Sequence, residues 1–339
     1  MSPCYSLREE PQYLSINMAA DGDDIFVYLG GEQVVPDGVT HAVIDPSVKT
    51  VRRGAFHYRR QLVSVIFHDG VEIIEREAFW NCRSLRRLKF LGVREIGDKA
   101  FINCYALSDV EFGNNLETIG MGAFEWCRSL RSIKMPSVRS IDIWAFSDCE
   151  QLTEAEFGID LESIDGNTFY NCRKLQRITI PLKVGLFSFD HEENRYTQFD
   201  NCDNLTVVDI VGAGGMNKTI SSLLLETWRD EMNQEINRIN QELPDTDADE
   251  KTDFIRQCIR LVYGRLELFK AEHSRLLKEH MTQLELAIWK TKLDEMDDNS
   301  SPKGQTKRVE VNDCTRVEKR ITSGADIIIK NVLPFLKLK

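Results

Sequence analysis

The chain has 339 residues, of which 42% are apolar and 29% are charged, and its formal net charge is −11. This length and composition predict about two globular domains and exclude a mini-protein, a collagen-like fibre and a wholly disordered chain. Residues 1–216 hold 22 basic and 32 acidic residues, a balance that argues against nucleic acid as a partner, because binding to phosphate backbones relies on Lys and Arg.

Residues 1–38 are predicted to be an N-terminal tail and cap. Residues 1–22 lack the apolar run and the small-residue cleavage site of a secretory signal. The most apolar stretch of the chain, Ile327–Leu336, is interrupted by Lys330 and Asn331 and is too short to span a bilayer. We therefore expect no signal peptide, no transmembrane segment and no membrane partner.

A strict internal repeat follows the N-terminal segment. Its units begin with an aromatic head, at Ala55-Phe56, Ala78-Phe79, Ala100-Phe101, Ala123-Phe124, Ala145-Phe146 and Thr168-Phe169, and are 22 or 23 residues apart. Three positions after the Phe, all of these units except the first have a Cys, and a Leu follows the Cys by three. Each Leu opens a run in which apolar residues alternate, as in Leu85-Arg86-Arg87-Leu88-Lys89-Phe90, and this alternation predicts a half-buried strand.

A degenerate unit from Val39 to Val51 and a last unit headed by Phe199 bring the expected number of repeats to about eight. An insertion at 186–198, either a binding loop or a tolerated excursion, precedes the last unit. One such unit cannot bury its own apolar face, but stacked units build a continuous core beside a parallel sheet.

The pattern Ala-Phe-x-x-Cys-x-x-Leu-x-x-Ile-x-Ile/Phe, with Ile96-Gly97 or Ile119-Gly120 before the next head, resembles the BspA-like leucine-rich repeats. The resemblance covers about residues 39–211. It implies an α/β solenoid, right-handed and curved, with a binding role and no known ligand.

The repeat Cys residues allow two interpretations: a metal or disulfide site, or a column of small buried side chains, which free Cys fills well. The column is favoured because each repeat supplies one Cys with no His beside it, and because stacked Cβ vectors point the same way. The odd total of nine Cys favours a reducing compartment, so we expect a cytoplasmic or nuclear protein.

Alternate strand residues should point outward and form the candidate binding face of the solenoid. They are Arg87, Lys89, Asp109, Glu111, Ser132, Lys134, Glu154, Glu156, Arg177 and Thr179. Their sign alternates between repeats, which predicts a ladder through Lys89, Glu111, Lys134 and Glu156. The ladder is either a self-neutralising surface that fixes register or a docking site for a partner of complementary charge.

After the glycine-rich stretch 212–215, residues 217–298 predict a long antiparallel helical hairpin. A first helix should begin at Thr219 or Ser221 and end at Leu243, before Pro244, and a second should run from about Glu250 to Asp297. Residues 299–322 are predicted to be a linker, and residues 323–339 are predicted to form a short C-terminal helix.

No catalytic motif, metal motif or cofactor motif stands out, so we expect a non-enzymatic protein without metal or cofactor. The leading hypothesis is an acidic scaffold that binds one or more proteins through the solenoid, with a helical module that caps it or forms homo-oligomers. One alternative is a cell-surface or secreted adhesion protein of the BspA-like type. The other is a structural oligomer built by the long helix.

Overall fold

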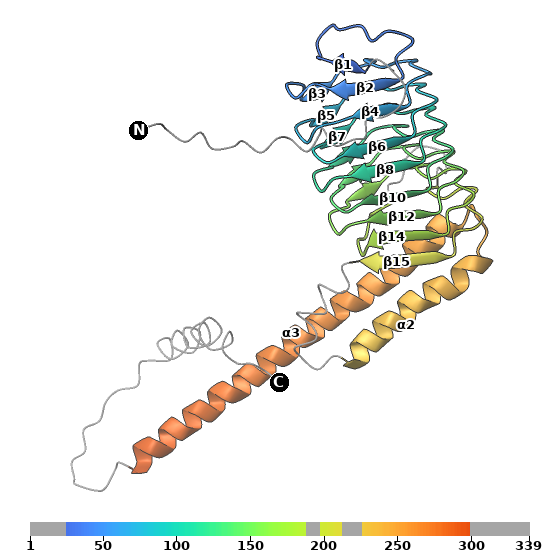
Figure 1. Cartoon of the computed structure of the whole chain (residues 1–339). Helices are drawn as coiled ribbons and strands as arrows, with labels where there is room; N and C mark the ends of the chain where they lie inside the picture. The colour runs from blue at the N-terminus through green and yellow to red at the C-terminus, as the bar shows by residue number, and fades with distance from the viewer. Residues whose placement is uncertain (1–24, 188–196, 212–225, 299–339) are drawn as a thin grey trace, which may run out of the picture.

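The computed structural model describes residues 25–187, 197–211 and 226–298. In these residues the chain forms a parallel β-solenoid followed by two helices, which confirms the predicted architecture (Figure 1). The predicted linker 299–322, the predicted C-terminal helix 323–339, the predicted start of the first helix and most of the insertion at 186–198 lie outside the described residues.

One side of the solenoid is a stack of parallel strands, one from each of the eight repeats and one, β1, that precedes the first repeat. They are β1 (Phe26–Tyr28), β2 (His41–Ile44), β4 (Ser64–Ile66), β6 (Arg87–Phe90), β8 (Asp109–Phe112), β10 (Ser132–Met135), β12 (Glu154–Phe157), β14 (Arg177–Pro181) and β15 (Val207–Val211). Backbone hydrogen bonds join them in two groups, β1-β2-β4-β6-β8 and β10-β12-β14-β15. Strands β8 and β10 are neighbours without a continuous ladder between them.

A two-residue strand before the aromatic head of each of six repeats forms another parallel sheet. Its two-residue strands are β3 (Thr50–Val51), β5 (Ile73–Ile74), β7 (Glu95–Ile96), β9 (Thr118–Ile119), β11 (Ser140–Ile141) and β13 (Ser163–Ile164). Tight turns make the remaining connections, and helices occur only after residue 211 in the described residues. The α component of the predicted fold class therefore lies in the C-terminal module.

The core of the solenoid is a column of stacked phenylalanine rings. From Phe56 to Phe199, the rings of successive repeats lie 4.8–5.8 Å apart between centroids and within 11° of parallel. Tyr28 extends the column by packing on Phe56 at 5.2 Å. All of these rings are fully buried. The Phe of the repeat motif therefore supplies the contact that holds one repeat on the next.

The cysteine column lies beside the rings and consists of free thiols. Each Sγ donates to the carbonyl of the Phe in the preceding repeat, at 3.1–3.4 Å from Cys82 to Cys202. The residue before each Cys has a positive φ, which Asn adopts more readily than most residues, and Asn81, Asn103 and Asn171 occupy that position. The thiols therefore close the turns instead of forming disulfides.

The six repeat thiols should be unreactive in the folded protein. Burial raises the pKa of Cys82 to about 12 and the pKa of the other repeat thiols well above their usual range. Because only the thiolate reacts with a disulfide reagent, Ellman titration at pH 8 should detect nine thiols after denaturation and at most three before it. Rapid reaction of more than three thiols in the native protein would contradict this packing.

The C-terminal module consists of α2 (Glu226–Glu242), a 3-10 turn η2 (Leu243–Asp245) and α3 (Lys251–Asp298). The turn lies at Leu243 and Pro244, where the sequence predicts the first helix to end. Helix α3 has 48 residues and is about 70 Å long. It begins at the last repeat and extends away from the solenoid, and the shorter α2 accompanies only its first part (Figure 1).

The two helices cover the C-terminal end of the solenoid. The buried Lys251 Nζ donates to the carbonyls of Cys202, Asp203 and Leu205 at 2.8–3.1 Å. Thr252 Oγ1 accepts from two backbone amides of the last repeat, and Asn240 Oδ1 accepts from the amide of Val208. These contacts satisfy backbone groups that a further repeat would otherwise bind, so the module is an end cap.

None of the helices in the described residues combines the length and the apolar character that a membrane span requires.

Candidate functional site

The outward side of strands β6 to β14 carries all ten residues of the candidate binding face. The burial of these strands alternates, so that Leu88, Val110, Ile133, Ala155 and Ile178 point into the core. The residues between them point outward and are exposed, apart from the half-buried Glu156 and Thr179. Register places Arg87 beside Asp109 and Lys89 beside Glu111 in the first group of strands. In the second group it aligns Ser132, Glu154 and Arg177 in one column and Lys134, Glu156 and Thr179 in the other.

Opposite charges on this face form ion pairs between neighbouring strands. Lys89 Nζ lies 3.1 Å from Glu111 Oε1, and Lys134 Nζ lies 2.8 Å from Glu156 Oε1. Arg177 also pairs with Asp209 on β15. The side chains of these pairs are between 41% and 69% exposed, so each pair contributes about 0–1 kcal/mol to stability.

The prediction of a continuous charge ladder is wrong in one respect: the charged residues on this face form separate ion pairs. Glu111 pairs back to Lys89, and no ion pair joins it to Lys134 in the described residues. The break coincides with the boundary between the two hydrogen-bonded sheets, at β8 and β10. Each pair therefore lies within a unit of two repeats.

Reversal of one charge should separate stability from binding on this face. In Lys89→Glu, two carboxylates oppose each other on exposed strands, so the free energy of unfolding should fall by no more than about 1 kcal/mol. Urea denaturation beside the exposed control Lys290→Glu measures this. A loss of several kcal/mol would show that the pair mainly maintains the fold, and would weaken its assignment as a docking site.

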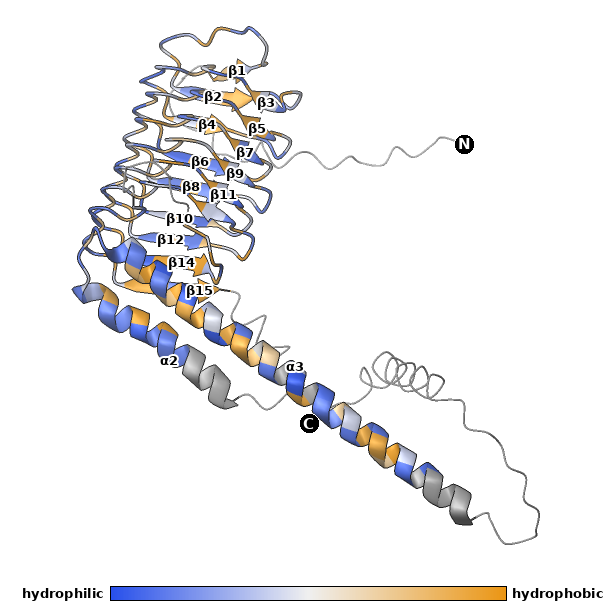
Figure 2. Cartoon of the chain, turned by 180° about the vertical axis from the view of Figure 1, so that it is seen from behind, coloured by the Kyte–Doolittle hydropathy of each residue, from blue (hydrophilic) through white to orange (hydrophobic). Residues whose placement is uncertain are grey.

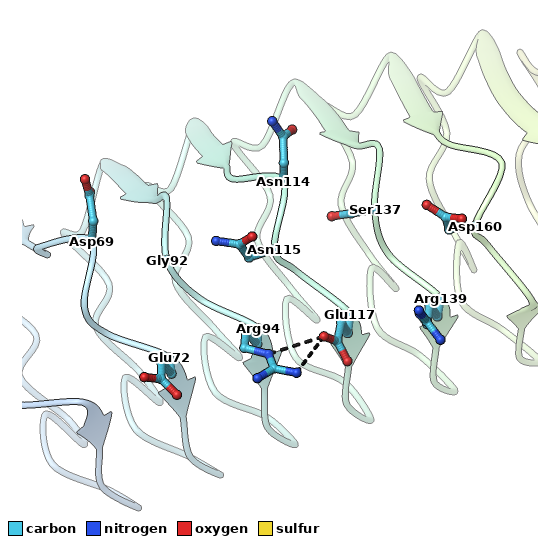
Figure 3. A pocket seen from close by; sticks show the side chains of 10 residues that line it. All are labelled: Asp69, Glu72, Gly92, Arg94, Asn114, Asn115, Glu117, Ser137, Arg139 and Asp160. Carbon is cyan, nitrogen blue, oxygen red and sulfur yellow. Dashed lines mark hydrogen bonds and ion pairs between the residues drawn. The ribbon is translucent and has the colours of Figure 1, made fainter.

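A second charged row lies where the two-residue strands begin. Glu72, Arg94, Glu117 and Arg139 each precede one of these strands and follow one another along the solenoid (Figure 3). Arg94 donates twice to Glu117 Oε1, at 2.8 and 3.2 Å. The row lines an open polar groove of about 640 Å³. An open groove with a polar lining differs from the enclosed apolar cavities that hold most small-molecule ligands.

Asp142 at the start of the fifth repeat has a perturbed pKa. Partial burial raises it, Asp165 and Asp98 add to the effect, and the Ile143 amide, which donates to Asp142 Oδ1 at 2.7 Å, opposes it. A carboxyl with a raised pKa in the folded state binds its proton more tightly there than in the unfolded chain. Ionised Asp142 therefore destabilises the fold at neutral pH.

Asp142→Asn should consequently stabilise the protein at pH 7, by about 0.5 kcal/mol after solvent screening. Asn keeps an oxygen for the Ile143 amide and removes the charge. The gain should shrink as the pH falls through the raised pKa of the folded state toward the ordinary Asp value, because the wild-type carboxyl then becomes neutral as well. Thermal midpoints at pH 7 and pH 4 measure this, and an equal gain at both values would contradict the assignment.

Among the described residues, no cluster of three or more His, Cys, Asp or Glu side chains is arranged to hold a metal ion.

The repeat pattern identifies the outward face but misses two features. Lys251, Thr252 and Asn240 of the end cap carry no sequence signal, because their partners are backbone groups of another element. The second charged row does leave a signal, since Lys49, Arg94 and Arg139 recur every 45 residues and Glu72 and Glu117 are also 45 apart.

Comparisons with known proteins agree with this architecture. A family model described as the BspA type leucine rich repeat region matches in six copies, over residues 38–137 and 94–213. No curated protein matches the chain.

Several solved structures of leucine-rich repeat proteins match part of the chain. A leucine-rich repeat protein from Eubacterium ventriosum is 21% identical, with a TM-score of 0.40, over 52% of this chain and 43% of that protein. The T. pallidum leucine rich repeat protein is 22% identical, with a TM-score of 0.34, over 55% of this chain and 73% of that one. This chain therefore spans less than half of the E. ventriosum protein. Because the family model covers more than half of its residues, the chain belongs to the BspA-type leucine-rich repeat family.

Proposed function

We propose that the protein is a non-enzymatic scaffold that binds a protein partner on the outward face of the solenoid sheet. One observation carries the proposal: ten polar and charged side chains, eight of them exposed and two half-buried, lie on the outward face of five parallel strands. Their backbones are fixed by the ladder, so a partner meets a preorganised surface and little ordering opposes binding. Alternating charge adds specificity, because a partner with the wrong sign meets repulsion.

A charge swap tests this function without changing the net charge. In the double variant Lys89→Glu with Glu111→Lys, the ion pair remains possible but its direction reverses. The full-length protein, this variant and a control swap, Arg94→Glu with Glu117→Arg, serve as baits in native extract, with quantitative mass spectrometry.

A partner that the wild type and the control retain, and the swap variant loses, supports the proposal. The same set of proteins on all three baits would count against the sheet face.

The proposal places the protein in the cytoplasm or nucleus, with neither nucleic acid nor membrane as a partner. The net negative charge argues against nucleic acid as a partner. The repeat cysteines are free thiols that hydrogen-bond to backbone carbonyls, which suits a reducing compartment. Fluorescence microscopy of a tagged full-length chain tests the location. A tagged chain at the cell surface or in the medium would favour the adhesion alternative.

A homo-oligomer through the helical module is part of the same proposal. Beyond the region that α2 accompanies, α3 exposes Leu276, Leu284, Leu286, Ile288 and Trp289. Apolar residues recur along this part of the helix (Figure 2). Leu284 and Ile288 lie four residues apart on one face of the helix, which a second copy of α3 would cover. In proteins most helical stability comes from the packing of such an apolar face.

Light scattering of the full-length protein and of Leu284→Glu with Ile288→Glu tests this contact. The wild type should be a dimer or larger, and the variant a monomer. A wild-type monomer would exclude both this contact and the structural oligomer.

A further inference from the structure

The turns of the first four repeats carry a cluster of arginines and aromatic rings that the sheet face does not use. The position after the repeat Cys, or after Arg59 in the first repeat, forms a column along the solenoid. The position before the Cys forms a second column beside it. We define the arginine–aromatic patch as Arg60, Arg83, Tyr105 and Arg128 of the first column with Tyr58 and Trp126 of the second.

Each guanidinium of the patch lies against a ring. Arg83 and Arg128 approach the Tyr105 ring with Cζ-to-centroid distances of 5.3 and 5.5 Å. Arg128 also lies 4.8 Å from the Trp126 ring, and Arg60 lies 5.5 Å from the Tyr58 ring. Stacking fixes these arginines, and two of them also use Nε: Arg83 donates to Asn81 Oδ1 at 3.3 Å and Arg128 lies 3.3 Å from Glu150 Oε1. Their terminal N–H groups are the ones that a carboxylate of a partner would meet.

Tyr58 and Trp126 occupy backbone positions that suit neither residue. Both have positive φ, 61° and 64°, at the turn position where other repeats have Asn81, Asn103 or Asn171. The turn imposes this conformation in every repeat with an aromatic head, as it also does at Asp148 and Asn201, so the bulky rings at Tyr58 and Trp126 are accepted at a position that favours Asn. The same two residues hold Arg60 and Arg128 in place. The two aromatic residues with positive φ are therefore the same ones that contact Arg60 and Arg128.

The composition of the patch indicates a protein partner. Trp, Tyr and Arg are the residues that dominate binding energy at protein interfaces. The three arginines form a local group of positive charges on a chain whose net charge is −11. In the fifth repeat the first column has an acidic residue, Glu150, whose Oε1 lies 3.3 Å from Arg128 Nε. Charge complementarity therefore selects an acidic segment confined to the first four repeats.

We propose that the arginine–aromatic patch binds an extended acidic segment of a partner protein, running along the stack of repeats. Neighbouring repeats lie about 4.8 Å apart, so Arg83 and Arg128, two repeats apart, are separated by about 10 Å along the stack. A segment in the extended polyproline II conformation covers this distance in about three residues and places every third side chain on the same side. The fitting segment carries Asp or Glu at every third position, with apolar side chains between them that contact the rings. This site rests on the proposed protein-binding function and adds a partner class to it.

Fluorescence anisotropy of the full-length protein with a labelled synthetic peptide tests the site. The probe is a 12-residue peptide, by our design, with Glu at every third position and leucines between. The same peptide with Gln for Glu and a single-stranded DNA of equal length are the comparison probes. The Glu peptide should bind, and should bind more weakly as salt is raised. Equal binding of the Gln peptide, or tighter binding of DNA, would overturn the assignment.

Three variants of the full-length protein locate the contact. Arg83→Ala with Arg128→Ala should weaken peptide binding about five-fold or more. Arg139→Ala with Lys290→Ala, which removes the same charge from other exposed faces, should change it less than about two-fold. Trp126→Asn restores the residue type that the turn favours, so it should keep the fold, checked by circular dichroism, and still weaken binding.

An equal loss in the Arg139 and Lys290 variant would reduce the effect to net charge and overturn the proposal, as would unchanged binding in Trp126→Asn. Failure of this site is distinguishable from failure of the proposed function. If the peptide does not bind but the sheet charge swap still releases a captured partner, only the patch is wrong.

Discussion

Substitution of Phe124 by alanine is expected to lower the free energy of unfolding by about 4 kcal/mol, in the range found for Phe removed from a core. The Phe124 ring is fully buried between Phe101 at 5.1 Å and Phe146 at 5.3 Å, and it also contacts Phe112 at 5.9 Å. Its loss leaves a cavity that rigid strands cannot close, because the backbone ladder fixes the spacing of repeats. Urea denaturation followed by circular dichroism measures the change.

The position of Phe124 in the middle of the stack predicts a second effect. In a solenoid each repeat contacts only its neighbours, so a weak central interface separates two blocks that then unfold at different urea concentrations. Tyr170→Ala is the control, because this aromatic side chain is exposed and lies outside the ring column; its cost should stay below about 1 kcal/mol. A Phe124→Ala loss similar to that of the control would contradict the ring column as the main inter-repeat contact.

Substitution of Lys251 by methionine should cost about 3 kcal/mol, because it removes three charge-assisted hydrogen bonds at a buried site. Burial lowers the pKa of Lys251, but the three donors of its ammonium group match the carbonyls of Cys202, Asp203 and Leu205. Methionine fills a similar volume and leaves those carbonyls without this partner. The loss should therefore come from hydrogen bonding more than from packing.

Hydrogen exchange distinguishes this local effect from general unfolding. In Lys251→Met, exchange should accelerate in β15 and in the first turns of α3, while β6 and β8 keep their protection. Lys290→Met on the exposed far part of α3 is the control and should leave stability unchanged. Uniform acceleration over the whole solenoid, or no acceleration at β15, would contradict the role of Lys251 in the end cap.

The sequence predicts the solenoid well because its signal is periodic. Leu88, Val110 and Ile133 alternate with polar residues, and this pattern places strands and faces together. The helical hairpin is equally readable, since Leu243 and Pro244 mark its turn. The second sheet is hidden, because a strand of two residues such as Glu95–Ile96 is too short to show alternation.

The remaining differences depend on contacts between distant segments. The end cap needs the docked position of Lys251 against the last repeat, which no local pattern encodes. The charge ladder breaks because Glu111 has a choice of two neighbours and pairs with Lys89. The repeated backbone fixes the strands, but it does not fix which neighbouring side chain a charged residue pairs with.

The central claim is that a protein binds the outward face of the sheet, and carboxyl footprinting tests it most directly. Carbodiimide labelling of the full-length protein is measured by mass spectrometry with and without the captured partner. Asp109, Glu111, Glu154 and Glu156 report on the sheet face, while Glu72, Glu117 and Glu162 lie at the second sheet and serve as internal controls. We expect slower labelling of the first four carboxylates and unchanged labelling of the other three when the partner is bound. Protection of Glu72, Glu117 and Glu162, or of α3 alone, would contradict this claim.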